Sequence, residues 1–289
     1  MKGLILKNQN GYFTIATENN SQIISRSRGK TKRQGNILVG DWVEYDFDKE
    51  HTPSIVSVYP RKNVLSRPPV ANIDQFILTI AVTNPNPSLF VIDKMLIAAE
   101  AFRIPVLICI NKADLNIVKA EEISSIYKKA GYDSIIVSAI QKTGIDILYS
   151  KLRGAVISFS GPSGVGKSSL LNLLIRKEYF NCQEVSSQTG RGKNTTRHSE
   201  LIKLTNTNYL MDTPGYTALD LNADLADGLD FLFREFRPYL GKCKFNNCLH
   251  LKEPACAILK ALEEGIIQKT RYKSYQDILT EIHNRMVKY

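Results

Sequence analysis

The sequence contains no long apolar run. Its N-terminal apolar stretch, within residues 1–7, is too short for a signal peptide, and no later stretch approaches the about 18 apolar residues that span a bilayer. Internal repeats and low-complexity tracts are also missing. We therefore expect a cytoplasmic protein that has no membrane as partner.

Cysteines and acidic residues are both scarce. Five cysteines in an intracellular chain favour buried thiols or metal ligands over a disulfide framework. The chain has 28 Asp and Glu against 38 Lys and Arg, a formal net charge of +10. An excess of positive charge favours a polyanionic partner, either nucleic acid or an anionic membrane. A length of 289 residues allows two or three domains that each bury a core.

Residues 1–67 are predicted to form an OB-like β-barrel. Asn10 and Gly11 stand between two apolar runs and suit the positive φ of a tight hairpin. Short strand-like runs follow at residues 22–24, 42–45 and 55–58. Five cations occupy the eight positions from Arg26, where phosphate contact is favoured over a merely solvated loop.

Consecutive prolines at Pro68 and Pro69 place a domain boundary there. Residues 68–222 then alternate buried strands with helical segments, which predicts a parallel α/β sheet with helices on both faces. In such sheets ligands bind at the carboxyl ends of the strands.

A phosphate-binding loop follows the predicted strand at residues 155–159. The pattern G-x-x-x-x-G-K-S lets backbone amides surround the phosphates of a nucleotide, while the lysine reaches the terminal phosphates and the hydroxyl binds Mg²⁺. A helix follows at once, with its N-terminus toward the phosphates. The residues expected here are Gly161, Pro162, Ser163, Gly164, Val165, Gly166, Lys167, Ser168 and Ser169.

Two loops after earlier strands point to guanine. Asn111, Lys112 and Asp114 form N-K-x-D, in which the carboxylate accepts hydrogen bonds from the ring N–H and exocyclic amine that only guanine offers. Ser138 and Ala139, again after a strand, resemble the supporting motif whose backbone meets the guanine oxygen.

Downstream, Asp212 and Gly215 fit D-x-x-G, in which the aspartate supports Mg²⁺ and the glycine amide senses the γ-phosphate. The polar segment 186–199 offers Thr195 or Thr196 as the switch threonine that touches Mg²⁺ and the γ-phosphate. Tyr216 stands where Ras-like enzymes carry the glutamine that orients water, so slow hydrolysis without a stimulating partner is predicted.

Residues 223–289 are predicted to form a mainly helical zinc-binding domain. Cys243, Cys248, His250 and Cys256 supply three thiolates and an imidazole, which complete a closed tetrahedral site of structural type. Further on, residues 269–275 mix cations with tyrosines. That pattern suits RNA contact and the capped start of a packed helix equally well.

The motif order is unusual, because N-K-x-D precedes the phosphate loop. Circular permutation leaves a packed sheet intact while moving the chain ends. Together, the basic barrel, the motif order and the Cys-Cys-His-Cys cluster make the chain resemble the circularly permuted RsgA (YjeQ/YloQ) GTPases over essentially its whole length.

The resemblance implies a GTPase that binds the small (30S) ribosomal subunit and its rRNA in the GTP state during late maturation. It would hydrolyse GTP to GDP when stimulated by the subunit. It further implies one structural Zn²⁺, Mg²⁺ with the nucleotide, and a monomer. His198 is a candidate for positioning water. The competing hypotheses are an RNA-binding assembly module whose turnover is irrelevant, and a P-loop ATPase or kinase.

Overall fold

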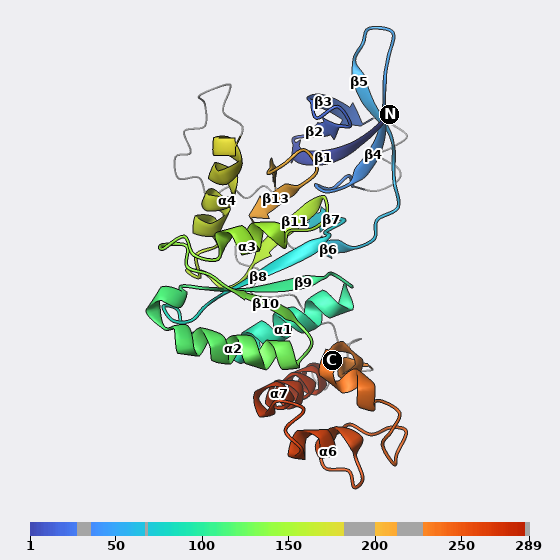
Figure 1. Cartoon of the computed structure of the whole chain (residues 1–289). Helices are drawn as coiled ribbons and strands as arrows, with labels where there is room; N and C mark the ends of the chain where they lie inside the picture. Colours follow the sequence, from blue (N-terminus) through green and yellow to red (C-terminus); the bar gives the residue numbers. More distant parts are fainter. Residues whose placement is uncertain (28–35, 67–68, 182–199, 213–227, 287–289) are drawn as a thin grey trace. The chain divides into compact units, whose positions relative to one another are not determined.

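The computed structural model describes residues 1–27, 36–66, 69–181, 200–212 and 228–286. The chain forms two compact units whose helices and strands are drawn in Figure 1. The first unit comprises Met1–Ile77, Tyr149–Ser160 and Lys167–Pro214, and the second comprises Leu78–Leu148, Gly161–Gly166 and Gly215–Tyr289. Within the described ranges, no helix is both long enough and apolar enough to cross a membrane.

The N-terminal segment folds as the predicted barrel. Its strands are β1 (Lys2–Gln9), β2 (Tyr12–Thr17), β3 (Gln22–Ser27), β4 (Trp42–Phe47) and β5 (Pro53–Val58). They pair in the order β1-β2-β3-β5-β4, and β1 pairs with β4 to close the barrel. Asn10 and Gly11, with φ of 52° and 83°, make the expected turn between β1 and β2. Ile5, Ile15 and Val43 fill the interior and are fully buried.

A short hairpin follows the barrel. Strands β6 (Val64–Ser66) and β7 (Pro69–Ala71) pair in antiparallel fashion on either side of the predicted boundary. Arg67 and Pro68 lie outside the described residues. The domain limits at 67 and 222 stay predictions.

The central sheet has the strand order β10-β9-β8-β11-β13-β12. Its strands are β8 (Gln75–Ala81), β9 (Val106–Asn111), β10 (Asp133–Ile136), β11 (Val156–Ser160), β12 (Leu201–Lys203) and β13 (Tyr209–Asp212). The pairs β9–β10 and β11–β13 are parallel, which confirms the predicted α/β class. The edge strand β12 pairs antiparallel with β13 and was not predicted.

Among the described residues, four helices accompany the central sheet, and side chains cap the start of the first two. The four are α1 (Leu89–Ala101), α2 (Ile117–Lys129), α3 (Ile145–Ser150) and α4 (Lys167–Asn181). Ser88 accepts from the Val91 amide at the start of α1, and Asn116 accepts from the Lys119 amide at the start of α2.

The C-terminal part of the second unit is mainly helical, as predicted. It contains α5 (Leu229–Leu232), the 3₁₀ segment η4 (Arg234–Tyr239), α6 (Ala257–Glu263) and α7 (Lys269–Met286). Phe233, Phe236 and Tyr275 lie in one cluster with Ile97 and Ala98 of α1. The C-terminal helices therefore share a hydrophobic core with the helix that follows β8.

Arg271 is a fully buried cation in that core. Its guanidinium donates to Asp93 Oδ1 at 2.6 Å and to Glu235 Oε1 at 2.7 Å. Burial disfavours the charged guanidinium, but Asp93 and Glu235 outweigh it and hold the pKa of Arg271 above its usual value. Tyr272 and Tyr275 are buried as well. These three side chains of residues 269–275 therefore belong to helix packing and not to an RNA surface.

Replacing Arg271 by methionine should lower the free energy of unfolding by about 3–5 kcal/mol at neutral pH, because two buried carboxylates lose their cation. Burial already raises the pKa of Asp93, and losing Arg271 raises it further. The variant should therefore lose stability as pH rises from about 4 through the raised pKa, and regain part of it on acidification.

Denaturant unfolding at several pH values measures this effect, with the exposed Arg103→Met as the matched control. Equal midpoints for the two variants would contradict the importance of the buried cation.

Candidate functional site

The guanine motif follows directly from the end of β9. Asn111 closes the strand, and Lys112 adopts a left-handed conformation (φ 63°) that turns the chain into the 3₁₀ segment η2 (Ala113–Leu115). Asn111 is 1% exposed and uses both ends of its amide. Its Nδ2 donates to Val165 O at 2.9 Å, and its Oδ1 accepts from the Ala139 amide at 3.0 Å. One side chain thus joins N-K-x-D to the phosphate loop and to Ser-Ala.

Ser138 orients the predicted guanine-binding carboxylate. Its hydroxyl donates to Asp114 Oδ1, and its oxygen accepts from the Gln141 amide at 3.1 Å. Ser138 is fully buried, whereas Asp114 is partly exposed. The carboxylate is therefore held from one side and accessible from another, as recognition of a base requires.

The phosphate loop connects β11 to α4 and needs glycine for a physical reason. A Cβ on Gly161 would lie 2.2 Å from Thr79 O, and a Cβ on Gly166 would lie 2.3 Å from Asn111 Nδ2. Both glycines also have positive φ, 140° and 98°. Because Lys167 begins α4, the first turn of the helix adjoins the loop, and a helix N-terminus favours anions.

The other predicted nucleotide ligands are placed only in part. Ser168 and Ser169 lie in the first turn of α4, and Asp212 is the last residue of β13. Thr195, Thr196, His198 and Gly215 lie outside the described residues.

Cys243, Cys248, His250 and Cys256 come together as predicted, with their ligand atoms all within 4.8 Å of one another. His250 Nδ1 lies 3.6 Å from Cys243 Sγ and 3.4 Å from Cys256 Sγ, and the two sulfurs are 3.8 Å apart. A tetrahedral Zn²⁺ with bonds of about 2.3 Å to sulfur and about 2.0–2.1 Å to nitrogen separates sulfurs by about 3.8 Å and sulfur from nitrogen by about 3.6 Å. The four residues therefore fit a tetrahedral metal ion.

Sequence comparison agrees with this combination of sites. A family model described as RsgA GTPase matches residues 58–222, and one described as RsgA N-terminal domain matches residues 2–55. The chain belongs to the RsgA family. The family resemblance, the barrel with its α/β domain, and the assignment to GTP-hydrolysing enzymes are thereby confirmed.

Full-length RsgA relatives include two proteins named small ribosomal subunit biogenesis GTPase RsgA, both 40% identical to this chain. The one from Clostridium botulinum strain 657 aligns over 100% of this chain and 99% of its own length, and the one from Caldanaerobacter subterraneus over 99% and 97%.

Solved structures of similar fold include YjeQ from Thermotoga maritima (TM-score 0.84, 34% identity, 97% of this chain and 98% of that one). Another is YloQ, described as a circularly permuted GTPase (TM-score 0.82, 32% identity, 98% and 95%).

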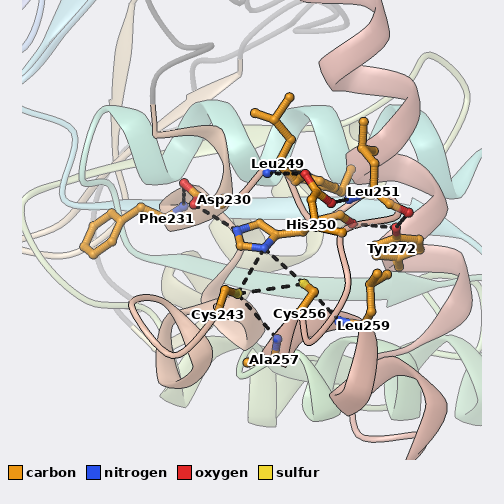
Figure 2. Close-up of polar contacts among 12 residues, drawn as sticks. Asp230, Phe231, Cys243, Leu249, His250, Leu251, Cys256, Ala257, Leu259 and Tyr272 are labelled. Atoms are coloured by element: carbon orange, nitrogen blue, oxygen red, sulfur yellow. Dashed lines mark hydrogen bonds and ion pairs between the residues drawn. The ribbon is translucent and has the colours of Figure 1, made fainter. Parts of the chain in front are cut away.

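The metal cluster of this RsgA-family chain has supporting residues that spacing did not reveal. Asp230 Oδ2 lies 3.3 Å from His250 Nε2, which orients the imidazole so that Nδ1 faces the sulfurs (Figure 2). The hydrogen bond from His250 lowers the pKa of Asp230. Tyr272 donates its hydroxyl proton to His250 O at 2.6 Å. Asp230 lies 20 residues before His250 and outside the segment that carries the four ligands, so the sequence gives no sign of its role and only the fold identifies it.

A carboxylate shapes the loop that carries His250. Glu253 accepts from the amides of Leu249 and Leu251 at 2.8 Å and of Lys252 at 2.9 Å. Burial opposes the charged form, but these amides prevail and lower the pKa of Glu253 to about 2. The loop is thus fixed by its own backbone as well as by the cluster.

Asp230→Ala should weaken Zn²⁺ affinity by about 10- to 100-fold, because His250 loses the partner that fixes its tautomer and orientation. Competition between the protein and a chelator of known affinity measures the change. Asp277→Ala removes a partly exposed carboxylate that forms an ion pair with Lys273 one helical turn away, and serves as the control. Equal Zn²⁺ affinities for the two variants would show that Asp230 has no supporting role.

Proposed function

We propose that this chain binds GTP and Mg²⁺, acts on the small ribosomal subunit during its maturation, and hydrolyses GTP to GDP when the subunit stimulates it. The single observation that carries the proposal is Asn111, whose amide joins the guanine motif to a phosphate loop that follows it in the sequence. Relatives that align over the full length are named for small-subunit biogenesis, which supports the choice of partner.

The nucleotide roles follow from donor and acceptor chemistry. Backbone amides of residues 161–166 and the ammonium of Lys167 would hold the phosphates, while Ser168 and Asp212 would face Mg²⁺. Asp114 would accept from the guanine ring N–H and amine, with Lys112 and the Ser138–Ala139 backbone beside the base.

Hydrolysis would depend on the partner. Thr195 or Thr196 would sense the γ-phosphate, and His198 would help position water. Tyr216 replaces the water-orienting glutamine of Ras-like enzymes, so the isolated chain should turn over slowly. Positioning or charge supplied by a partner is a class of effect worth about 10³- to 10⁵-fold in rate.

Zn²⁺ is the metal that the Cys₃His group would hold. With four protein ligands there is no open coordination position, so we assign the ion a structural role. It would connect the loop at residues 243–256 to the hydrophobic core around Phe236 and Tyr275. The C-terminal helices would therefore depend on it for part of their stability.

The barrel offers a surface suited to rRNA. Arg26 lies over the Tyr12 ring at 4.3 Å, and Lys2 lies over the rings of Trp42 and Tyr59 at 4.7 and 5.4 Å. Tyr12 and Tyr59 are exposed. Cations beside accessible aromatic faces suit phosphate contact and base stacking.

We expect a cytoplasmic monomer.

The GTPase rate should rise by about 10³-fold or more when small subunits are added to the purified chain. Subunit affinity should fall by about 10- to 150-fold between about 50 mM and about 200 mM salt if about two to four phosphates are neutralised. Turnover by the isolated chain equal to that of the complex would contradict the role of Tyr216. Normal release of Lys167→Ala from subunits would favour an assembly module without turnover.

Asp114→Asn should shift base preference from guanine toward xanthine. Ser138 donates to Oδ1, so an asparagine can keep its oxygen there and turn its NH₂ donor toward the base. Guanine then meets a donor with its own amine, whereas xanthine offers a carbonyl. GTP affinity should fall by about 10- to 150-fold and XTP should become the better ligand.

Nucleotide competition assays measure this preference, and exposed Asp133→Asn is the matched control. Unchanged GTP preference in Asp114→Asn, or ATP preference in the unmodified chain, would overturn the role of Asp114.

A further inference from the structure

The barrel contacts the outer strands of the central sheet through β1 and β12. Lys7 of β1 and Glu200 form an isolated antiparallel β-bridge, and Lys7 Nζ lies 3.3 Å from Glu200 Oε2. Glu200 immediately precedes β12. Both residues belong to the first compact unit, which also contains β11, β12 and β13.

The outer side of β1 is covered at this point. Ile5 faces the barrel interior, and Leu4 points to the opposite side because successive strand residues alternate. Leu4 and Leu6 are nevertheless only 1% and 3% exposed. The register of β1 on β2 shifts between Ile5 and Lys7, and such bulges redirect the strand. Strands β1 and β12 have more than one pair of residues in contact, so the contact extends beyond a single ion pair.

Strand β12 links this contact to β13, which carries Asp212 at its end. Leu201 pairs with Met211 of β13, the strand that ends at Asp212. In the other direction along the chain, Thr196 lies four residues before Glu200. The Lys7–Glu200 pair thus marks the start of a strand that lies between the two segments expected to sense the γ-phosphate.

We propose that Lys7 and Glu200 are positioning residues for GTP hydrolysis, which couple engagement of the barrel by the subunit to β13, the strand that ends at Asp212. The inference rests on the proposed function. If binding of the subunit to the barrel favours the GTP-bound state, thermodynamic linkage requires that the GTP-bound chain binds the subunit more tightly than the GDP-bound chain does. The pair is partly exposed, so its expected effect is modest: about two- to five-fold in an equilibrium.

Charge reversal on each side of the bridge tests the coupling. Lys7→Glu and Glu200→Lys should each lower subunit-stimulated kcat by about three- to ten-fold, because like charges then face each other. The double variant, which restores an opposite-charge pair, should return to within about two-fold of the unmodified chain. KM for GTP should stay the same, and the preference of subunits for the GTP-bound over the GDP-bound chain should fall in parallel with kcat.

The controls separate coupling from general charge and from folding. Lys49→Glu makes the same charge change at an exposed barrel residue and should leave stimulated kcat unchanged. Lys7→Gln gives a milder variant, and thermal unfolding checks that each protein is folded.

Suppose that subunits stimulate the unmodified chain. If Lys7→Glu then keeps the same stimulated kcat, or if the double variant does not regain it, the coupling role of the pair is wrong while the proposed function stands. Absence of any stimulation in the unmodified chain overturns the proposed function, and this inference with it.

Discussion

One buried amide, that of Asn111, holds together the three loops of the proposed nucleotide site. Asn111 sits at the end of β9, donates to the phosphate-loop backbone at Val165 and accepts from the backbone of Ala139. A buried amide left without partners costs free energy, so the three loops are stable mainly in one mutual arrangement. Gly166 has no Cβ, which leaves room for that amide beside the loop. The motifs are close in space because one strand end presents a side chain with a donor and an acceptor.

The division of the chain into compact units crosses the GTPase motifs. The guanine loop, residues 161–166 and the metal cluster belong to one unit, and the barrel belongs to the other together with α4 and the strands that lead to Asp212. Each accessory region therefore shares a packed unit with a different part of the nucleotide machinery.

Charge is used in opposite ways in the two units. On the barrel, Arg26 and Lys2 lie over aromatic rings at the surface, where a polyanion can reach them. In α7, Arg271 is buried between Asp93 and Glu235 and lies 4.7 Å over the Phe233 ring. Composition alone counts these cations equally, but burial makes one of them structural and leaves the others available for recognition.

Local sequence determined those features whose chemistry is encoded in a short stretch. Asn10-Gly11 specifies a hairpin, the phosphate loop requires glycines next to Lys167, and N-K-A-D requires a carboxylate at 114. The metal ligands lie within fourteen consecutive residues. Each of these patterns depends on residues that are close in the sequence, so each can be predicted before the fold is known.

Tertiary structure alone decided the contacts between distant segments. Asp230 supports His250, Arg271 turns inward to Asp93, and Lys7 meets Glu200 across 193 positions of sequence. The edge strand β12 exists because β13 pairs with it, and three residues carry little signal of their own. Long-range packing and burial create these interactions, and neither leaves a spacing or a period in the sequence by which it could be found.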